Sequence, residues 1–567
     1  MLESGRRNSL YALALLVCFA AGGCKGQPVS ATQTSAASVD LTAVSSRLHE
    51  IANSGKLADL RWPDFSDYRL HFQHVYEASN FSPIWISNGQ PTSQALAVIQ
   101  VLEGSKQKGL NPDDYDASRW QERLNAVKSA NPDTVARCDA ALTVSTMRYI
   151  SDLHIGRVNP KHFDFGIDIE QKKYDLPLFL TQELIHAQNV QSVLDGVEPP
   201  YNGYKRTEAA LQQYLQLAAK GDGPPVPEPS KGIAPGDSYA GVSQLAQRLQ
   251  LLGDLPQNAQ IDTSSGIYKG ALVDAVKHFQ ARHGLGADGK IGKDTVRQLN
   301  VPLTQRVHQL QDALERWRWL PPNFPTPPVV VNVPEFVLRA YGPNQQIALQ
   351  MNVVTGKAVR HQTPVFTDNI QYIVFRPYWN VPSGILRGET IPAIVKNRNY
   401  VANKNFEVTD FSGKVITSGP ISDSVLAQLR AGKLTVRQKP GPDNALGLVK
   451  FIFPNAHNVY LHSTPAPQLF SQSRRDFSHG CIRVQKPVDL AAYLLRNQPP
   501  WTLDKVQQAM QSGPDNQQVN LATRVPVLIL YVTAIVEEDG SVHFFDDIYG
   551  HDKELEDVLA KGMPYPG

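Results

Sequence analysis

The sequence predicts a multidomain α+β protein, in which a mainly helical N-terminal scaffold domain and a small three-helix domain precede a β-rich domain. Three observations support this fold class. The chain has 567 residues, which is too long for a single hydrophobic core. Apolar residues recur at helical spacing between residues 61 and 222. From residue 329 onward, short runs rich in β-branched and aromatic residues indicate strands.

The first 23 residues have the pattern of an export signal. Arg6 and Arg7 precede an apolar run over residues 10–21, and small residues follow it up to Cys24. The run is too short to cross a bilayer comfortably, which argues against a membrane anchor. Because Cys24 directly follows Ala-Gly-Gly, the site also resembles a bacterial lipoprotein cleavage site. We therefore expect an exported chain, either free or lipid-anchored through Cys24.

Composition places the remaining sequence among ordinary folded proteins. Hydrophobic residues make up 42% of the chain, charged residues 19%, and the net charge of +2 gives no argument for a nucleic-acid partner. Residues 24–60 are rich in Ser, Ala, Thr and Gln and are predicted to form a flexible tether. The scaffold domain over residues 61–222 shows no chemistry of its own, and a Pro- and Gly-rich linker over residues 223–235 follows it.

Residues 236–303 fit a compact three-helix domain. Its first helix has apolar positions over residues 242–252 and ends at Gly253; its second has them over residues 272–279 and ends at Gly284. The whole segment resembles the small peptidoglycan-binding domain that is attached to many cell-wall enzymes. The alternative is a spacer that has lost its ligand, since no residue here marks a ligand site.

The β-rich domain is predicted over residues 329–545, after a connector over residues 304–328 that contains ERWRWLPP and FPTPP. Residues 546–567 are predicted to be a C-terminal tail. Inside the domain, helical segments interrupt the strands over residues 380–436. Because this insertion is long and directly precedes the most reactive stretch of the chain, it is a candidate lid.

That stretch is residues 458–484, NVYLHSTPAPQLFSQSRRDFSHGCIRV. Cys481 would be a nucleophile as a thiolate, and His462, 19 positions earlier, is a base that could activate it. Strand alternation places Tyr460 and His462 on one face of their strand, and Cys481 and Arg483 on one face of theirs. If the two strands are neighbours, these four side chains form one wall, which is typical of an active site.

Three other cysteines occur besides Cys481. Cys18 would leave with the signal peptide, and Cys24 is the possible lipidation site. Cys138 lies in a helical segment and fits a buried small hydrophobe. A disulfide between Cys138 and Cys481 is the alternative in an oxidising compartment, and it would abolish the thiol chemistry.

Several motifs in order resemble the L,D-transpeptidases. They are Val354-Thr355-Gly356-Lys357, Thr363-Pro364, YWNVP at residues 378–382, RQKPGPDNALG at residues 437–447, His462, and Ser-His-Gly-Cys ending at Cys481. Length, the helical first part, the peptidoglycan-binding domain and the insertion are similar to those of the large multidomain periplasmic members. The motifs are specific as an ordered set, whereas Ser-His-Gly-Cys alone would be weak.

The resemblance implies a periplasmic acyltransferase that forms 3→3 cross-links between peptidoglycan stem peptides. Cys481 would attack the carbonyl that follows the L-centre of the third stem residue in a tetrapeptide donor, release D-alanine and hold the acyl group as a thioester. The side-chain amine of diaminopimelate on another stem would resolve it. The family implies inhibition by carbapenems, no cofactor and no metal, with cell-wall synthases as candidate partners.

The resemblance also implies roles for individual residues. His462 would be the base, the Ser463 carbonyl would orient it, and the N–H groups of Gly480 and Cys481 would hold the oxyanion. Substrate-binding roles are expected for Tyr460, Trp379, Arg483, Ser478 and His479. Arg483 would pair a stem carboxylate and stands where many members have Asn. Tyr460 and Trp379 could equally be packing aromatics.

Two other functions are considered. A cysteine peptidase would also use Cys and His, but papain-like enzymes place the histidine far downstream of the cysteine. A non-catalytic wall-binding scaffold would keep the fold without the chemistry.

A zinc site of His457, His462 and His479 fits no familiar ligand spacing.

Overall fold

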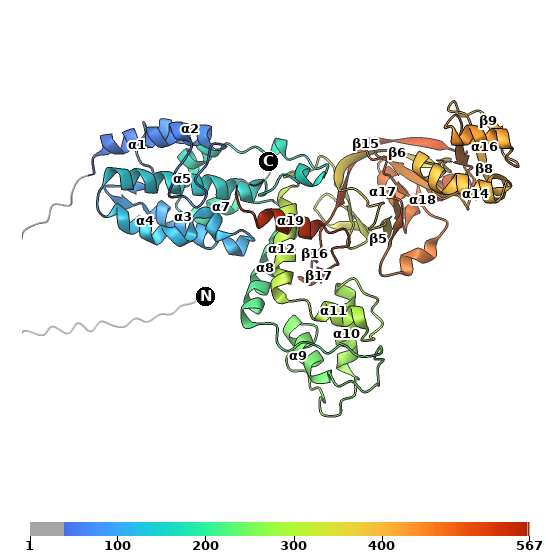
Figure 1. The fold of residues 1–567 in the computed structure, drawn as a ribbon, viewed down its shortest axis with the longest axis horizontal. Coiled ribbons are helices and arrows are strands. Elements are labelled where there is room, and N and C mark those ends of the chain that lie inside the picture. The colour runs from blue at the N-terminus through green and yellow to red at the C-terminus, as the bar shows by residue number, and fades with distance from the viewer. Residues whose placement is uncertain (1–38, 564, 566–567) are drawn as a thin grey trace, which may run out of the picture.

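The computed structural model describes residues 39–563 and 565 (Figure 1). The predicted signal peptide, Cys24 and the first part of the predicted tether lie outside this range. Within it, none of the helices is both long enough and apolar enough to cross a bilayer. A helical region, a small three-helix region and a β-rich region follow one another along the chain (Figure 1), as the predicted fold class requires.

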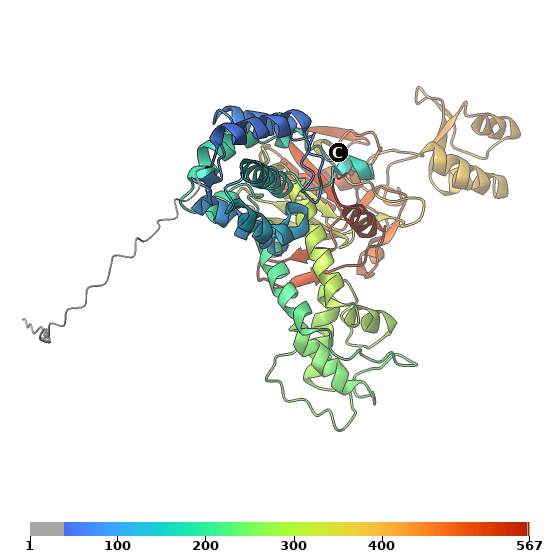
Figure 2. The ribbon, with the colours of Figure 1, turned by 60° about the vertical axis from the view of Figure 1, so that its left-hand side comes forward.

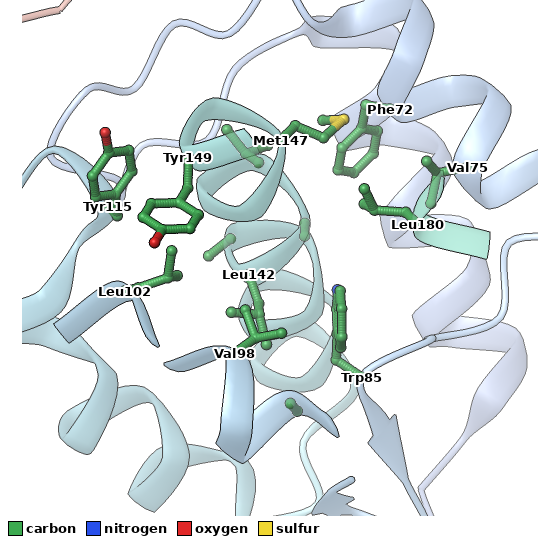
Figure 3. Packing of buried hydrophobic residues seen from close by; sticks show 14 of the residues in the cluster. Phe72, Val75, Trp85, Val98, Leu102, Tyr115, Leu142, Met147, Tyr149 and Leu180 are labelled. Carbon is green, nitrogen blue, oxygen red and sulfur yellow. The ribbon is translucent and has the colours of Figure 1, made fainter. Parts of the chain in front are cut away.

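The scaffold domain is built around one buried helix. Its elements are α1 (Leu41–Ser54), α2 (Arg69–Glu77), β1 (Ile86–Ser87), β2 (Gln90–Pro91), α3 (Ser93–Glu103), α4 (Trp120–Val127), α5 (Pro132–His154), α6 (Leu176–Leu178) and α7 (Val190–Asp195). The buried helix is α5, which is covered on nearly every side. It begins at Pro132 because the Asn131 side chain caps it by accepting two backbone N–H groups. Figure 3 shows Trp85, Val98 and Leu180 packed around it.

The prediction of a flexible tether over residues 24–60 is wrong for its second part, which contains a helix. Residues Leu41–Ser54 form α1, whose Val44, Leu48 and Ile51 are buried against α5. These apolar residues recur at helical spacing within a Ser- and Ala-rich composition. The Asp40 side chain caps the helix by accepting the N–H groups of its first turn.

The three-helix domain has the predicted elements. They are α9 (Val242–Leu252), α10 (Ala271–Arg282) and α11 (Lys293–Leu299). Gly253 ends α9 with a φ of 82°, a left-handed conformation that favours glycine. The preceding segment, predicted to be a linker, contributes Val226 and Ile233 to the core of this domain.

The prediction of a connector over residues 304–328 is wrong for its first half, which forms a helix. Helix α12 (Leu303–Arg318) lies along α8 (Asn202–Lys220), and the pair joins the scaffold to the β-rich domain (Figure 1). Leu303, Val307, Leu310 and Leu314 form its buried stripe. This stripe has helical spacing, although the Trp- and Pro-rich end of the segment obscures it in the sequence.

The β-rich domain is built on a nine-stranded mixed sheet. Its strands are β3 (Val329–Asn332), β4 (Val337–Tyr341), β5 (Ile347–Gly356), β6 (Phe366–Phe375), β11 (Val449–Ile452), β12 (Leu461–His462), β13 (Asp476–Ser478), β14 (Ile482–Val484) and β15 (Gln517–Leu530). The order is β13-β5-β14-β12-β11-β6-β15-β3-β4, and β4 also pairs with β5. The sheet therefore curls back on itself like a barrel around one hydrophobic core.

Helices and a small hairpin complete this domain. They are α17 (Pro487–Leu495), α18 (Leu503–Ser512), β16 (Ala534–Val536), β17 (Val542–Phe544) and α19 (His551–Leu559). The prediction of a C-terminal tail over residues 546–567 is wrong, because Leu555 and Val558 of α19 are buried in the core of the sheet. The charged sequence HDKELEDVL hides the short apolar stripe that anchors this helix.

The insertion over residues 380–436 is a separate lobe. Its elements, with the strands that flank it, are β7 (Trp379–Asn380), α13 (Ser383–Ile385), α14 (Ile391–Lys396), α15 (Tyr400–Asn403), β8 (Phe406–Thr409), β9 (Val415–Thr417), α16 (Asp423–Arg430) and β10 (Thr435–Gln438). The predicted helices are present, but the strands form an additional sheet in the order β7-β10-β8-β9. The lobe has its own core and projects from the main sheet (Figure 2). Strands of two to four residues give almost no alternation to detect.

Candidate active site

Two neighbouring strands bring the predicted site residues together. Strands β12 and β14 run parallel, with His462 opposite Arg483. The Ile482 N–H donates to the Tyr460 carbonyl at 3.1 Å, which places Tyr460 beside Cys481. The apolar residues between these positions are buried in the core. The wall of four side chains predicted from alternation therefore forms.

His462 is a buried, neutral imidazole. Its Nδ1–H donates to the Ser463 carbonyl at 2.5 Å, which is the contact predicted for Ser463. Because the carbonyl can only accept, this bond leaves Nε2 with its lone pair. Burial and the positive charge of Arg483 lower the pKa of the imidazole to about 3. At neutral pH the ring is therefore free to accept a proton.

The backbone that follows β10 holds Ser463, the residue whose carbonyl orients His462. Gly447 has a φ of 63°, and a Cβ at this position would lie 2.5 Å from the Ser463 hydroxyl oxygen. The Ser463 N–H donates to the Val449 carbonyl at 2.9 Å. The glycine that ends the RQKPGPDNALG motif thus permits the close approach that fixes Ser463.

Cys481 is a partly buried free thiol. Both cysteines in the described part of the chain, Cys138 and Cys481, are free, so the alternative disulfide between them does not form. The thiol donates to the Asn458 carbonyl at 3.8 Å. Burial raises the pKa of the Cys481 thiol, while the Tyr460 backbone and hydroxyl group oppose the shift. The thiol and the imidazole on this wall are therefore both neutral at rest.

Ser478 shapes the turn that presents the nucleophile. Its hydroxyl donates to the Cys481 carbonyl at 2.5 Å and accepts from the Gly480 N–H at 3.1 Å. Gly480 has a φ of 115°, which favours glycine. One of the two N–H groups predicted for an oxyanion hole is thus engaged by Ser478, and the Cys481 N–H is the remaining predicted donor.

A buried hydrogen-bond network holds this turn against strand β5. The Thr363 hydroxyl donates to the Gly480 carbonyl at 2.8 Å and accepts from the Gly356 N–H at 2.8 Å. The Tyr549 hydroxyl donates to the Gly356 carbonyl at 2.6 Å and accepts from the Thr363 N–H at 3.2 Å. Two of the motifs that carried the resemblance therefore fix the position of Gly480. Tyr549, from the segment predicted as a tail, was not predicted to take part.

Lys450 is a residue of this wall that the sequence did not predict. It lies on β11 opposite His462, and its Nζ is 5.8 Å from the ring centroid of Tyr460. Burial lowers the pKa of its ammonium group, and a thiolate at Cys481 would oppose the shift. Its two neighbours on the strand are buried. Alternation in Val-Lys-Phe-Ile was therefore the signal that could have found it.

Two of the predicted substrate-binding residues lie against the insertion. His479 and Glu389 form a hydrogen bond of 2.7 Å between Nε2 and Oε1, which joins the turn of the nucleophile to the lobe. Trp379 packs 6.1 Å from the ring of Phe406, measured between centroids, and belongs to the packing of the lobe's core. The structure therefore brings His479 to the junction with the insertion and places Trp379 at the base of the lobe.

Other pockets and clusters lie away from Cys481. The ring centroid of His457 is 5.1 Å from that of Phe366, and within the described residues no group of three or more His, Cys, Asp or Glu side chains could hold a metal ion. A cavity of about 580 Å³ lies between the α8–α12 pair and the strands β3 and β4, where Tyr201, Trp317 and Phe324 line it. It does not include the candidate catalytic residues.

Comparison with known families matches three parts of the chain. Residues 71–211 match the family described as "Scaffold domain", and residues 238–299 match "Putative peptidoglycan binding domain". Residues 327–527, which contain the wall of Cys481 and His462, match "L,D-transpeptidase catalytic domain". The matched ranges follow the three regions of the fold.

A protein of Haemophilus influenzae (strain ATCC 51907 / DSM 11121 / KW20 / Rd), described as "Putative L,D-transpeptidase", is similar to part of the chain. The two are 32% identical over 228 residues, which is 40% of this chain and 45% of the relative. The aligned part of the chain thus covers less than half the length of that relative. Taken with the family matches, this shows that the chain carries an L,D-transpeptidase catalytic domain, preceded by a scaffold domain and a peptidoglycan-binding domain.

Proposed function

We propose that this protein is a peptidoglycan L,D-transpeptidase that forms 3→3 cross-links between stem peptides. The observation that supports this most is the pairing of β12 with β14, which sets Cys481 and His462 on one wall of a domain of that family. Acyl transfer needs a nucleophile, a base, a group that orients the base and a donor for the oxyanion. Cys481, His462, the Ser463 carbonyl and the Cys481 N–H are suited to these four roles.

Acylation begins from the neutral pair. As the Cys481 sulfur attacks the carbonyl carbon that follows the L-centre of the donor's third residue, Nε2 of His462 accepts the thiol proton. A tetrahedral intermediate forms, and the Cys481 N–H stabilises its oxyanion. The bond between this carbon and the nitrogen of D-alanine then breaks, and His462 returns the proton to that nitrogen. D-Alanine leaves and a thioester remains on Cys481.

Deacylation uses the same groups in reverse. The side-chain amine of the third residue of a second stem attacks the thioester carbon, and His462 accepts a proton from the amine. The new amide bond forms, the bond between carbon and sulfur breaks, and the proton returns to the sulfur of Cys481. The product is a 3→3 linked dimer and the enzyme is restored.

The flanking domains fit a polymeric substrate. A peptidoglycan-binding domain beside an L,D-transpeptidase domain indicates a protein that works outside the cytoplasm. We place it in the periplasm, exported by the N-terminal signal. There it is either free or anchored by a lipid on Cys24. Binding of the wall by the three-helix domain would keep the catalytic domain near its substrate.

Purified tetrapeptide muropeptides test the proposal. The wild-type protein should convert them to 3→3 dimers and release D-alanine, whereas Cys481→Ala should form no dimers. Monomer cleavage to tripeptides without dimers would instead identify a cysteine peptidase. Absence of both products, together with no covalent carbapenem adduct on Cys481 by mass spectrometry, would leave a wall-binding scaffold.

A further inference from the structure

Two cations lie on the strands that flank β12, one on each side of His462. Lys450 lies opposite His462 on the antiparallel partner strand, and Arg483 lies opposite His462 on the parallel one. Side chains at paired positions point to the same face of a sheet. Both ammonium and guanidinium groups therefore border the space in front of Cys481, and the charge of each interacts with that thiol.

These two cations have no counter-ion in the part of the chain that the structure describes. Among residues 39–563 and 565, neither Lys450 nor Arg483 forms an ion pair, and the buried Nε of Arg483 has no hydrogen-bond acceptor. Other buried cations are held differently: Arg316 by Asp552, Arg339 by Glu335, and Arg475 by backbone carbonyls. Within the described residues, the partly buried Lys450 and Arg483 have neither of these kinds of partner.

Two unpaired, partly buried charges of the same sign destabilise the free protein. Each has lost part of its hydration without gaining a partner of opposite charge. An anion bound beside Cys481 would offset this loss of hydration and would accept charge-assisted hydrogen bonds from these side chains. Such an arrangement is expected where a ligand, and not the protein, supplies the negative charge.

The donor of the proposed reaction carries an anion at a suitable place. In a tetrapeptide the leaving D-alanine ends in a free carboxylate, whose carbon lies about 4 Å from the scissile carbonyl carbon. In a pentapeptide the free carboxylate is displaced by a further residue, up to about 3.5 Å along the chain. A cation pair beside the nucleophile can therefore distinguish the two donors by the position of their charge.

We propose that Lys450 and Arg483 form a carboxylate subsite that binds the free carboxylate of the leaving D-amino acid and selects donors that end one residue beyond the scissile bond. The identity of this ligand rests on the proposed transpeptidase function. The proposal of an anion subsite beside Cys481 does not, because it is argued from the two cations without a partner.

Alkylation of Cys481 tests the subsite without turnover. Iodoacetate and iodoacetamide both transfer a carbon to the sulfur and release iodide, but only iodoacetate carries a carboxylate. In the full-length protein the ratio of the two rates, followed by mass spectrometry of the Cys481 peptide, should fall roughly tenfold in Lys450→Met, since a charge-assisted contact is lost. Lys450→Arg should restore the ratio. Lys505→Met, which removes an exposed lysine on α18, should leave it unchanged.

The ratio distinguishes a carboxylate subsite from an ammonium group that only stabilises the thiolate of Cys481. If Lys450→Met slows both reagents equally, the ammonium group acts on the thiolate and the subsite is wrong. An unchanged ratio in a variant with an unaltered circular dichroism spectrum would also overturn it.

Donor peptides then identify the ligand. With a tetrapeptide donor, Lys450→Met should raise KM with little change in kcat, and it should not alter KM for the same peptide ending in a carboxamide. Equal effects on the acid and the amide would contradict the assignment of the leaving carboxylate. If muropeptides give no dimers while the alkylation ratio still depends on Lys450, the subsite stands and the transpeptidase proposal fails.

Discussion

Burial sets the protonation of the candidate catalytic pair. His462 has an imidazole pKa of about 3, because it is buried and lies near Arg483, and burial also raises the pKa of Cys481. Both shifts disfavour an imidazolium–thiolate pair in the resting protein. The proton should therefore move only as the sulfur attacks, which makes His462 a general base and not the partner of a stored thiolate.

The pH dependence of Cys481 reactivity follows from these shifts. His462 stays neutral above about pH 3, so its protonation does not change between pH 5 and 9. The thiol pKa lies above its ordinary value, so the thiolate fraction keeps rising through this range. The rate of alkylation by iodoacetamide should climb continuously from pH 5 to 9. A plateau between about pH 5 and 8 would reveal a resting ion pair and contradict the neutral pair.

At the scale of elements, the insertion is joined to the catalytic turn by few contacts. The hydrogen bond between His479 and Glu389 links them, and side-chain exposures of 30% and 60% make this pair weak on its own. The lobe has an independent core. A separate core and a weak junction are consistent with the predicted lid, which would move as a unit over the site.

Removal of the lobe tests its role as a lid. Asn380 lies opposite Arg437 in the pairing of β7 with β10, so an Asn-Gly turn can replace residues 381–436 without opening the sheet. The deletion should lower cross-linking of muropeptides at least tenfold, because substrate is no longer enclosed, while iodoacetamide should alkylate Cys481 at nearly the wild-type rate. Unchanged cross-linking would refute a lid, and loss of thiol reactivity would show that the lobe supports the active-site wall itself.

Strand alternation predicted much of the site, and the limits of that signal explain what it missed. Tyr460, His462, Cys481 and Arg483 alternate with buried residues, so their common face was readable once the strands were taken as neighbours. Lys450 alternates in the same way but stands outside the Ser-His-Gly-Cys region, and only the pairing of β11 with β12 reveals its position.

The missed elements share a different cause. Helices α1, α12 and α19 have narrow apolar stripes inside polar, Pro-rich or charged segments, and composition alone described them as tether, connector and tail. Their stripes find partners only in the folded chain, where α1 contacts α5, α12 contacts α8, and α19 packs on the sheet. Tertiary packing stabilises such helices more than local propensity does.

At the scale of the whole molecule, buried ion pairs tie the regions together. Arg316 of α12 and Asp552 of α19 are paired at 2.5 Å, with side-chain exposures of 5% and 5%. The Arg282 side chain of the three-helix domain donates to the Val542 carbonyl of β17. These contacts fix α12 and the three-helix domain against the β-rich domain, and α12 also packs along α8 of the scaffold region. The three regions should therefore behave as one body.

Breaking the buried pair should destabilise this assembly. Asp552→Ala removes the carboxylate that is hydrogen-bonded to the buried Arg316 and leaves Asp312 as its remaining acidic neighbour. Breaking a buried pair typically costs about 3–5 kcal/mol, and Asp312 should keep the loss near the lower end. Calorimetry should show a lower unfolding temperature for the catalytic region. As a control, Asp557→Ala removes the exposed partner of Lys553 on the same helix and should give no measurable change. Equal unfolding temperatures for the two variants would mean that the junction does not stabilise the fold.

The thioester on Cys481 is the central claim and can be measured directly. The full-length protein should be mixed with a tetrapeptide donor whose diaminopimelate amine is blocked, quenched rapidly in acid and analysed by intact mass and peptide mapping. We predict a mass increase equal to the tripeptide acyl group on the Cys481 peptide, with one D-alanine released for each adduct, and no increase in Cys481→Ala. D-Alanine release without any adduct on Cys481, or an adduct that persists in Cys481→Ala, would contradict covalent catalysis by this cysteine.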